Sequence, residues 1–425
     1  MTAFQFTGLF LAFLIASTIC RFWLSSRQMR HVAMHRSKVP TQFSDAITLE
    51  SHQKAADYTV AKGRLSFIDI LLGVVVTLGF TLFGGIQFLV DWAAQWSPTS
   101  PFFQQLLILV SFGLIATLIG LPMEWYRQFR LEERFGFNRR TLGLFVSDQI
   151  KGLALGAAIG GPLIAAIVWI MQNMPLWWFW AWVLWISFST LMMVIGPMII
   201  LPLFNKLEPL PDGPLNQRVQ SLMKRCEFGA AGLFVMDGSK RSGHGNAFFA
   251  GMGKGRRIVL FDTILEQLAP EEIEAVLAHE LGHFKRRHII KRIVPSLLIA
   301  LPIFWLIDFL MHQSWFYQGL GVTVQLSDGQ YQGVALALFA LAMPVFSYFI
   351  EPLSGLVSRK HEFEADEFAT RYSDSKHLIN ALVKMYQDNA STLTPDPIHS
   401  AFYDSHPPAA IRIGRLLQLP AQAVQ

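Results

Sequence analysis

The chain has 425 residues, of which 52% are hydrophobic and only 15% are charged. Soluble proteins average about 25% charged residues, so this composition excludes an ordinary soluble enzyme and a disordered chain. The net charge of +5 would suit nucleic-acid binding in a soluble protein. In a membrane protein it reflects Lys and Arg at cytoplasmic helix ends, so no nucleic-acid partner is expected. With only Cys20 and Cys226 present, no disulfide framework is expected.

Seven apolar segments without charged residues are candidate membrane helices, because a crossing needs roughly 20 apolar residues. The stretch 152–205 counts as two because Gln172, Asn173 and Pro175 interrupt it. The candidates are 1–20, 70–90, 92–123, the two halves of 152–205, 293–307 and 331–350. The segments 26–65 and 124–150 are expected to be amphipathic cytoplasmic loops. The predicted fold class is therefore mainly α, a polytopic membrane protein with about seven transmembrane helices.

Lys and Arg are distributed unevenly between the loops. The loops at 91–102, 172–176 and 312–331 contain neither residue, whereas the intervening loops are basic. The positive-inside rule then places the N-terminus outside and the C-terminus in the cytoplasm. Seven crossings agree with this, because an odd number puts the two termini on opposite sides. The chain ends in Ala-Gln-Ala-Val-Gln without an ER-retrieval sequence, which favours a bacterial inner membrane over the endoplasmic reticulum.

Two stretches are too polar to cross a membrane, and both fall on the cytoplasmic side. We expect them to fold together as one soluble domain with a small hairpin or sheet. The predicted division of the chain is 1–205 for the first five helices, 206–292 and 352–425 for the soluble parts, and 293–351 for the last two helices.

Secondary structure within the first soluble part can be predicted from short patterns. Residues 232–235 and 258–261 look like strands, and 247–250 can pair with the latter in a hairpin. Pro270, followed by two glutamates, predicts the start of a helix, because proline fits the first turn and carboxylates face the positive end of the helix dipole.

The helix expected from Pro270 carries an HExxH motif formed by His279, Glu280 and His283. Residues i and i+4 share a helix face, so the two imidazoles can bind one Zn²⁺ while Glu280 reaches a water on the metal. Roughly 0.01 chance matches are expected in such a chain, so the motif is specific. A pair of surface histidines is the competing interpretation. The apolar residues of 275–281 instead indicate a buried helix, in which polar groups need partners.

A catalytic zinc takes three protein ligands and a water, so the third ligand must come from another segment. The polar helical region 358–366, just after the last crossing, offers Glu362, Glu364 and His361. From the residues alone, each of these three could be the third ligand. The region could also be a charged helix that faces solvent and binds no metal. Asp366, four residues after Glu362, can accept the ring N–H of a ligating histidine.

One further histidine, His288, follows the HExxH motif within a cluster of Lys and Arg. We interpret it as a residue of the membrane interface rather than as a metal ligand.

The sequence resembles the type I CAAX prenyl protease family, which consists of seven-helix integral-membrane zinc endopeptidases of the gluzincin class. The resemblance covers most of the chain after the first loop. Besides HExxH, it is carried by residues 134–138, 202–211, 237–248, 257–263, 358–366 and 405–408, with Arg412 after them.

This resemblance implies roles for residues that spacing alone does not settle. Glu362 becomes the expected third zinc ligand, with Arg359 and Asp366 supporting the ligands. Asn246 and His406 are expected over the active site, where they contact the substrate backbone or the developing oxyanion, and positioned donors stabilise such charge. Without the resemblance, Asn246 would be a turn residue in a Gly-rich loop and His406 a helix-entry residue.

The expected reaction is metal-assisted peptide hydrolysis with one Zn²⁺ per chain, in which Glu280 takes a proton from water and passes it to the leaving amine. The resemblance implies cleavage after a prenylated cysteine, so the expected partners are a peptide or protein substrate, lipidated in that case, and membrane lipid. A bacterium is not expected to contain such substrates, which leaves a broader quality-control endopeptidase as the alternative. A transporter with a structural metal site is less favoured, because transporters bind substrate at broken helices in mid-membrane.

Overall fold

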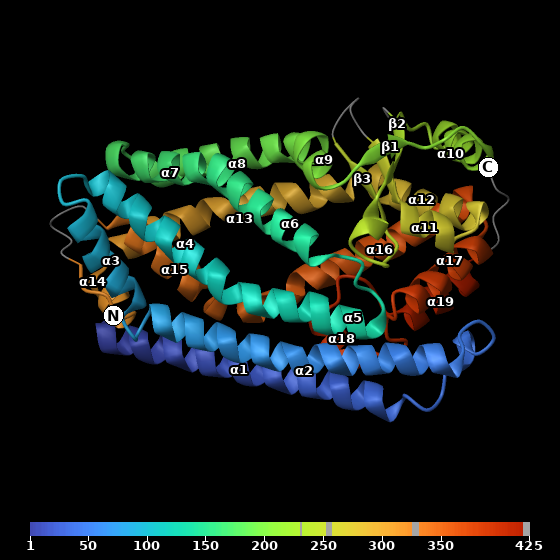
Figure 1. Cartoon of the computed structure of the whole chain (residues 1–425), viewed down its shortest axis with the longest axis horizontal. Helices are drawn as coiled ribbons and strands as arrows, with labels where there is room; N and C mark the ends of the chain where they lie inside the picture. The colour runs from blue at the N-terminus through green and yellow to red at the C-terminus, as the bar shows by residue number, and fades with distance from the viewer. Residues whose placement is uncertain (230–231, 252–256, 325–330, 420–425) are drawn as a thin grey trace.

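The computed structural model describes residues 1–229, 232–251, 257–324 and 331–419. Long helices run along the longest axis of the molecule, and a small sheet and shorter helices gather at one end (Figure 1). The start of the first helix, α1, lies at the opposite end from the last helix, α19 (Figure 1).

Seven helices in the described ranges are long and apolar enough to cross a membrane, which confirms the predicted number. Three of these spans consist of helical segments joined through a π-helical turn. The spans are formed by α1 (Ala3–Met34), α2 (Leu49–Phe80), α4 (Pro101–Tyr126) with α5 (Glu133–Phe135), α6 (Leu142–Leu155) with α7 (Gly161–Asn173), α8 (Trp177–Ile195) with α9 (Leu201–Phe204), α13 (His288–Met311), and α15 (Gln332–Ser347).

The predicted limits of the second crossing are wrong, and so are those of the two predicted loops, 26–65 and 124–150. The crossing expected at 70–90 is α2, which already begins after Thr48, whose side chain caps the helix by accepting a hydrogen bond from the backbone N–H of Ser51. The chain turns at Gly84, which has a left-handed φ of +81°, and α3 (Gly85–Trp96) is a separate helix. A charge-free run marks only the part of a helix that can lie in hydrocarbon. Polar residues that favour helix can continue the same helix past the end of that run.

The expected loop 124–150 is likewise mostly helical. The third span runs to Phe135, and α6 begins at Leu142, where the side chain of Thr141 caps it. Only six residues, 136–141, connect the two helices.

The spans differ in how far they are covered by other helices. In the apolar window of the span Trp177–Phe204, 0% of residues are buried, against 44% in that of Gln332–Ile350. Lipid is the natural cover for exposed apolar side chains on spanning helices. The last span therefore lies inside the bundle, where α15 packs against α1 and α4.

The sheet has four strands in the order β1-β2-β4-β3. These are β1 (Leu207–Pro209), β2 (Gly232–Met236), β3 (Ala247–Ala250) and β4 (Arg257–Phe261). The pairing of β3 with β4 is antiparallel, with Ala247 opposite Leu260, which confirms the predicted hairpin. Apart from Gly251, the predicted turn 251–255 lies outside the described residues. Strand β3 lies at an edge of the sheet, and β1 was not predicted.

The other helices of the soluble parts lie at the same end of the molecule as the sheet (Figure 1). They are α10 (Pro214–Arg225), α11 (Asp262–Gln267), α12 (Pro270–Lys285), α16 (Pro352–Tyr372), α17 (Ser375–Asp388), α18 (Pro397–Tyr403) and α19 (Ala409–Gln418), while α14 (Ser314–Gly319) lies at the other end (Figure 1). One hydrophobic cluster combines residues of both polar stretches, among them Ile258, Leu277, Phe368 and Leu382. Helices α12 and α16 thus share a core although two crossings separate them in sequence.

Helices α12 and α16 come close together at Gly282, inside the HExxH motif. A Cβ at this position would lie 2.9 Å from the Cα of Ala365 and 3.1 Å from the Cβ of Phe368. Only glycine permits this approach, because backbone atoms of α16 cannot move aside as a flexible side chain can.

We expect Gly282→Ala to lower the free energy of unfolding by about 1–3 kcal/mol, the usual cost of overpacking, and to weaken metal retention by moving α16. Thermal unfolding in detergent and metal content measure the two effects. The matched control is Gly414→Ala on α19, where a Cβ meets nothing within 4 Å and alanine favours the helix. Equal stability of both variants would contradict the packing argument.

Candidate metal centre

Helix α12 is fixed at its start and buried along most of its length. Pro270 is its first residue, and Glu272 accepts hydrogen bonds from the backbone N–H of Ala269 at 2.8 Å and from Lys384 Nζ of α17 at 2.7 Å. A helix held in this way presents His279 and His283, one turn apart, toward α16.

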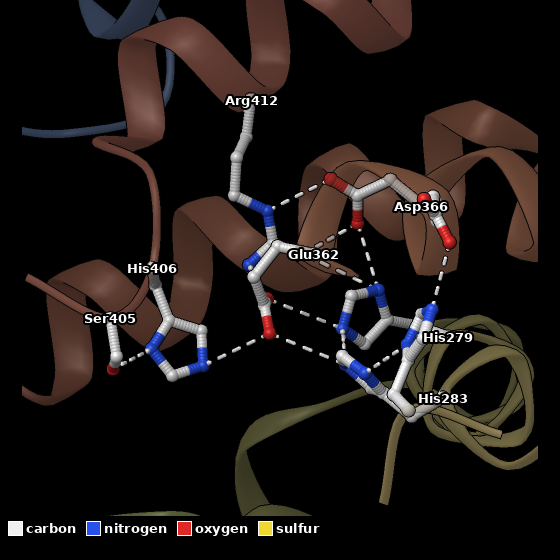
Figure 2. Close-up of polar contacts among 9 residues, drawn as sticks. His279, His283, Glu362, Asp366, Ser405, His406 and Arg412 are labelled. Atoms are coloured by element: carbon white, nitrogen blue, oxygen red, sulfur yellow. Dashed lines mark hydrogen bonds and ion pairs between the residues drawn. The ribbon is translucent and has the colours of Figure 1, made fainter. Parts of the chain in front are cut away.

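Glu362 of α16 faces these two histidines (Figure 2). Its Oε2 is 3.5 Å from His279 Nε2, its Oε1 is 3.3 Å from His283 Nε2, and the two Nε2 atoms are 3.2 Å apart. The three residues form a group whose ligand atoms all lie within 4.8 Å of one another. The structure therefore brings together the three residues that the sequence predicted as ligands.

The spacing of these atoms fits a tetrahedral zinc ion. Zinc binds His nitrogen and carboxylate oxygen at about 2.0–2.2 Å, so ligand atoms at tetrahedral angles are about 3.4 Å apart. The two histidine nitrogens are 3.2 Å apart, and each has a different oxygen of Glu362 at 3.3 or 3.5 Å, so small side-chain shifts would bring one oxygen to the tetrahedral spacing. Glu362 Oε2 is also buried without a hydrogen-bond partner in the described structure, which a metal ion would supply. The donor set thus fits the metal that the motif implies.

The second ring nitrogen of His279 is held by Asp366, with Nδ1 2.8 Å from Oδ1. Arg412 of α19 binds the same carboxylate through Nε at 2.9 Å and Nη2 at 2.5 Å. All three side chains are buried. Donation of the Nδ1 proton to Asp366 leaves the Nε2 lone pair of His279 facing the metal position, the orientation expected for a ligating histidine.

Burial and charge act in opposite directions on these groups. Burial lowers the pKa of His279, but the hydrogen bonds to Asp366 and Glu362 outweigh it and raise the pKa to about 9. Burial raises the pKa of Glu362, but the imidazoles of His279 and His283, each within 3.5 Å of one of its oxygens, hold that pKa well below its usual value. Metal binding near neutral pH would therefore displace a proton from His279.

The sequence suggested that His288 lies at the membrane interface within the basic cluster. In the structure it is instead buried, with only 2% of its surface exposed. Its Nδ1 is 3.0 Å from His283 Nδ1, and its Nε2 is 3.0 Å from Glu364 Oε2. With Nε2–H donating to Glu364, His288 Nδ1 accepts from His283, whose Nε2 lone pair then faces the metal position. Arg287, in a left-handed conformation with φ of 56°, separates α12 from α13 and returns His288 toward His283. No helical periodicity in the sequence anticipates such a break.

Glu280 and Asn246 are both accessible. Glu280 is half-buried on α12, and its carboxylate makes no hydrogen bond or ion pair with any described residue. Asn246 directly precedes the edge strand β3 and is exposed, and its Oδ1 accepts a hydrogen bond from the backbone N–H of Ala247 at 2.8 Å. Among the described residues, no hydrogen bond or ion pair joins Asn246 to the metal group.

His406 lies beside the metal group, whereas Arg359 does not contact it. The Nε2 of His406 is 3.5 Å from Glu362 Oε1, its Nδ1 is 3.0 Å from Ser405 Oγ, and its side chain is 63% exposed (Figure 2). Arg359 donates to the backbone oxygens of Asp404 at 2.5 Å and Ala401 at 3.1 Å. It therefore holds the segment before His406, and Arg412 is the arginine that supports the ligands.

Comparisons with known proteins agree with this geometry. A family profile described as the CAAX prenyl protease N-terminal region with five membrane helices matches residues 28–206, and the profile of peptidase family M48 matches residues 209–419. CAAX prenyl protease 1 of Saccharomyces cerevisiae is 33% identical, with 95% of this chain and 93% of the yeast protein covered. The chain belongs to the type I CAAX prenyl protease family.

Other family members are similar over nearly their whole length. The Arabidopsis thaliana homologue of CAAX prenyl protease 1 is 32% identical over 97% of both chains. The crystal structure of S. mikatae Ste24p matches with a TM-score of 0.88 and 32% identity, covering 98% of this chain and 100% of that one. This M48 peptidase is thus an integral-membrane metalloprotease that acts on peptides or proteins.

The Asp366 carboxylate should affect metal affinity without being a ligand. We expect Asp366→Asn to weaken metal binding by about 10- to 100-fold, as loss of a hydrogen-bonded partner of a ligating histidine does. Titration of the metal-free protein with Zn²⁺ measures this. Glu367→Gln makes the same chemical change one residue further along α16, in an ion pair with Arg371 that is partly exposed. Equal Zn²⁺ affinities of the two variants would show that Asp366 does not support the metal ligands.

Proposed function

We propose that this protein is a zinc endopeptidase that removes the C-terminal peptide after a prenylated cysteine. The observation that carries the proposal is the group of His279, His283 and Glu362, in which one ligand atom from each residue lies within 4.8 Å of the other two, close enough to bind one zinc ion. The peptidase domain would combine the soluble stretches 206–292 and 352–425, whose buried side chains share one cluster.

The proposed roles combine the positions of the side chains with the resemblance to the family, which alone suggests the role of Asn246. When bound, Zn²⁺ supplies a Lewis acid that polarises the scissile carbonyl and makes water more acidic. Glu280 accepts the proton of the attacking water and delivers it to the leaving amine. His406 and the side-chain N–H₂ of Asn246 donate hydrogen bonds to the oxyanion or to the substrate backbone. An extended substrate can pair with the open edge of β3.

A large apolar cavity supports a lipidated substrate. It has a volume of about 1260 Å³ and lies between the fifth and sixth spans and strand β3. Its lining includes Phe248 and Phe249 of β3, Phe284 of α12, Ile293 of α13 and Leu201 of α9. Burial of each CH₂ of a prenyl chain in such a site is favourable by about 0.8 kcal/mol.

Cleavage of matched peptides tests the proposal. A farnesylated peptide should be cut after its cysteine more efficiently than the unprenylated peptide, with products mapped by mass spectrometry. A chelator should abolish cleavage, and Zn²⁺ should restore it. Equal cleavage of both peptides at several bonds would favour the alternative, a broader quality-control endopeptidase. Chelator-insensitive cleavage would exclude the metal mechanism.

We propose that the N-terminus lies outside and the metal centre in the cytoplasm. The support is the absence of Lys and Arg from three loops, together with the odd number of spans in the described ranges. Reporter fusions at both ends test this orientation. The bacterial inner membrane stays a prediction, since the relatives named above come from yeasts and a plant, and fractionation of the source cells tests it.

A further inference from the structure

A polar cavity of about 500 Å³ adjoins the metal centre at His406. Residues of α1, α2, α17, α18 and the segment 404–408 line it. Because His406 lines this cavity and also lies 3.5 Å from Glu362, a single side chain separates the cavity from the metal ligands. Its volume is within the range of small-ligand sites.

Two charged side chains of opposite sign line this cavity, Lys62 of α2 and Asp404 in the segment after α18. The Nζ of Lys62 lies 4.0 Å from the centroid of the Tyr58 ring, and it forms no ion pair with a carboxylate of the described residues. The acidic group that acts on it electrostatically is Glu132. Glu132 already accepts a hydrogen bond from Tyr58 at 2.6 Å and has His244 Nε2 at 3.6 Å. The ammonium group of Lys62 is thus available to an anion from outside the chain.

Other polar groups in the cavity wall can also bind an anion. Ser66 contributes a hydroxyl to the wall, and hydroxyls donate readily to carboxylate oxygens. The hydroxyl of Thr59 already donates to the backbone oxygen of Ala55 at 2.8 Å, and that of Tyr403 is hydrogen-bonded to Tyr348 at 2.8 Å. His399 also lines the cavity, and its Nδ1 is buried without a hydrogen-bond partner among the described residues.

We propose that this cavity binds the C-terminal carboxylate of the substrate, with Lys62 as its ionic partner. The inference rests on the proposed function, because cleavage after the cysteine of a C-a-a-X terminus leaves three residues that end in a free carboxylate. Three extended residues span about 10 Å, a distance compatible with a cavity that begins at His406. The prenyl group suits the apolar cavity at Phe248, and the negative charge lies at the other end of the substrate.

The test compares two farnesylated peptides that differ only at the C-terminus, one a free acid and the other an amide. For the unmodified protein, kcat/KM should be about 10- to 100-fold higher for the acid, the range expected of a hydrogen bond to a charged group. Lys62→Met should abolish this preference, bringing kcat/KM for the acid down to that for the amide in the same variant, and Lys62→Arg should retain most of it. The unmodified protein should also be inhibited more strongly by the free tripeptide with a C-terminal carboxylate than by the same tripeptide as an amide.

Lys54→Met is the matched control, because Lys54 is also on α2 and also lies over an aromatic ring, that of Phe137 at 5.0 Å, but does not line the cavity. It should keep the full preference for the acid. The proposal is overturned if the unmodified protein cleaves acid and amide equally, or if Lys62→Met keeps the preference. Failure to cleave either prenylated peptide would instead reject the proposed function.

Discussion

Replacement of Glu280 by glutamine is expected to lower kcat by at least about 10²- to 10⁴-fold, the usual contribution of a general base, while the metal stays bound. Glu280 follows a ligand on α12, is half-buried, and makes no hydrogen bond or ion pair among the described residues. Its carboxylate is therefore free to accept a proton, whereas the amide of glutamine cannot. Because Glu280 belongs to no ionic network, the change should leave the fold intact.

The measurement pairs the kinetics of peptide cleavage with metal content. The control is Glu271→Gln in the first turn of the same helix, where the side chain forms a partly exposed ion pair with Arg218. Such pairs contribute little to stability, so this variant should keep both metal and activity. Full activity of Glu280→Gln would show that another group removes the proton.

The parts of the structure that could be predicted from the sequence depend on local patterns. The hydrocarbon-length apolar runs predict the seven spans, and HExxH predicts two ligands because its spacing matches one helical turn. The limits of α2 could not be predicted in this way, since its first residues are polar and helix formation there depends on packing against α1. The hairpin of β3 and β4 follows from two short apolar runs joined by a turn region with glycine at both ends, but β1 has only three residues.

Support of the ligands depends on contacts between distant segments, which residue spacing does not encode. Arg412 reaches Asp366 across 46 positions, and its role becomes visible only when α19 packs against α16. His288 reaches His283 through a helix break at Arg287, where a continuous helix would have placed the two rings on different faces. Arg359, in contrast, lies in the predicted segment but points to the backbone before His406.

The choice of third ligand is decided by metal content in two variants of α16. Glu362→Ala should retain far less than one metal ion per chain after dialysis and lose nearly all activity, because two histidines alone leave the zinc site incomplete. The stabilisation that bound metal gives to the folded state should disappear with it. The two histidines and the Asp366–Arg412 pair stay in place, so the chain should still fold.

Glu364→Ala tests the rival ligand that the sequence alone left open. Glu364 accepts a hydrogen bond from His288 at 3.0 Å and does not belong to the ligand group, so this variant should retain its metal. Glu367→Ala, at the partly exposed pair with Arg371, provides the neutral reference on the same helix. Loss of metal from Glu364→Ala together with retention in Glu362→Ala would reverse the assignment. Retention in all three would mean that the third ligand lies on another element, despite the 3.3 Å separation of Glu362 Oε1 and His283 Nε2.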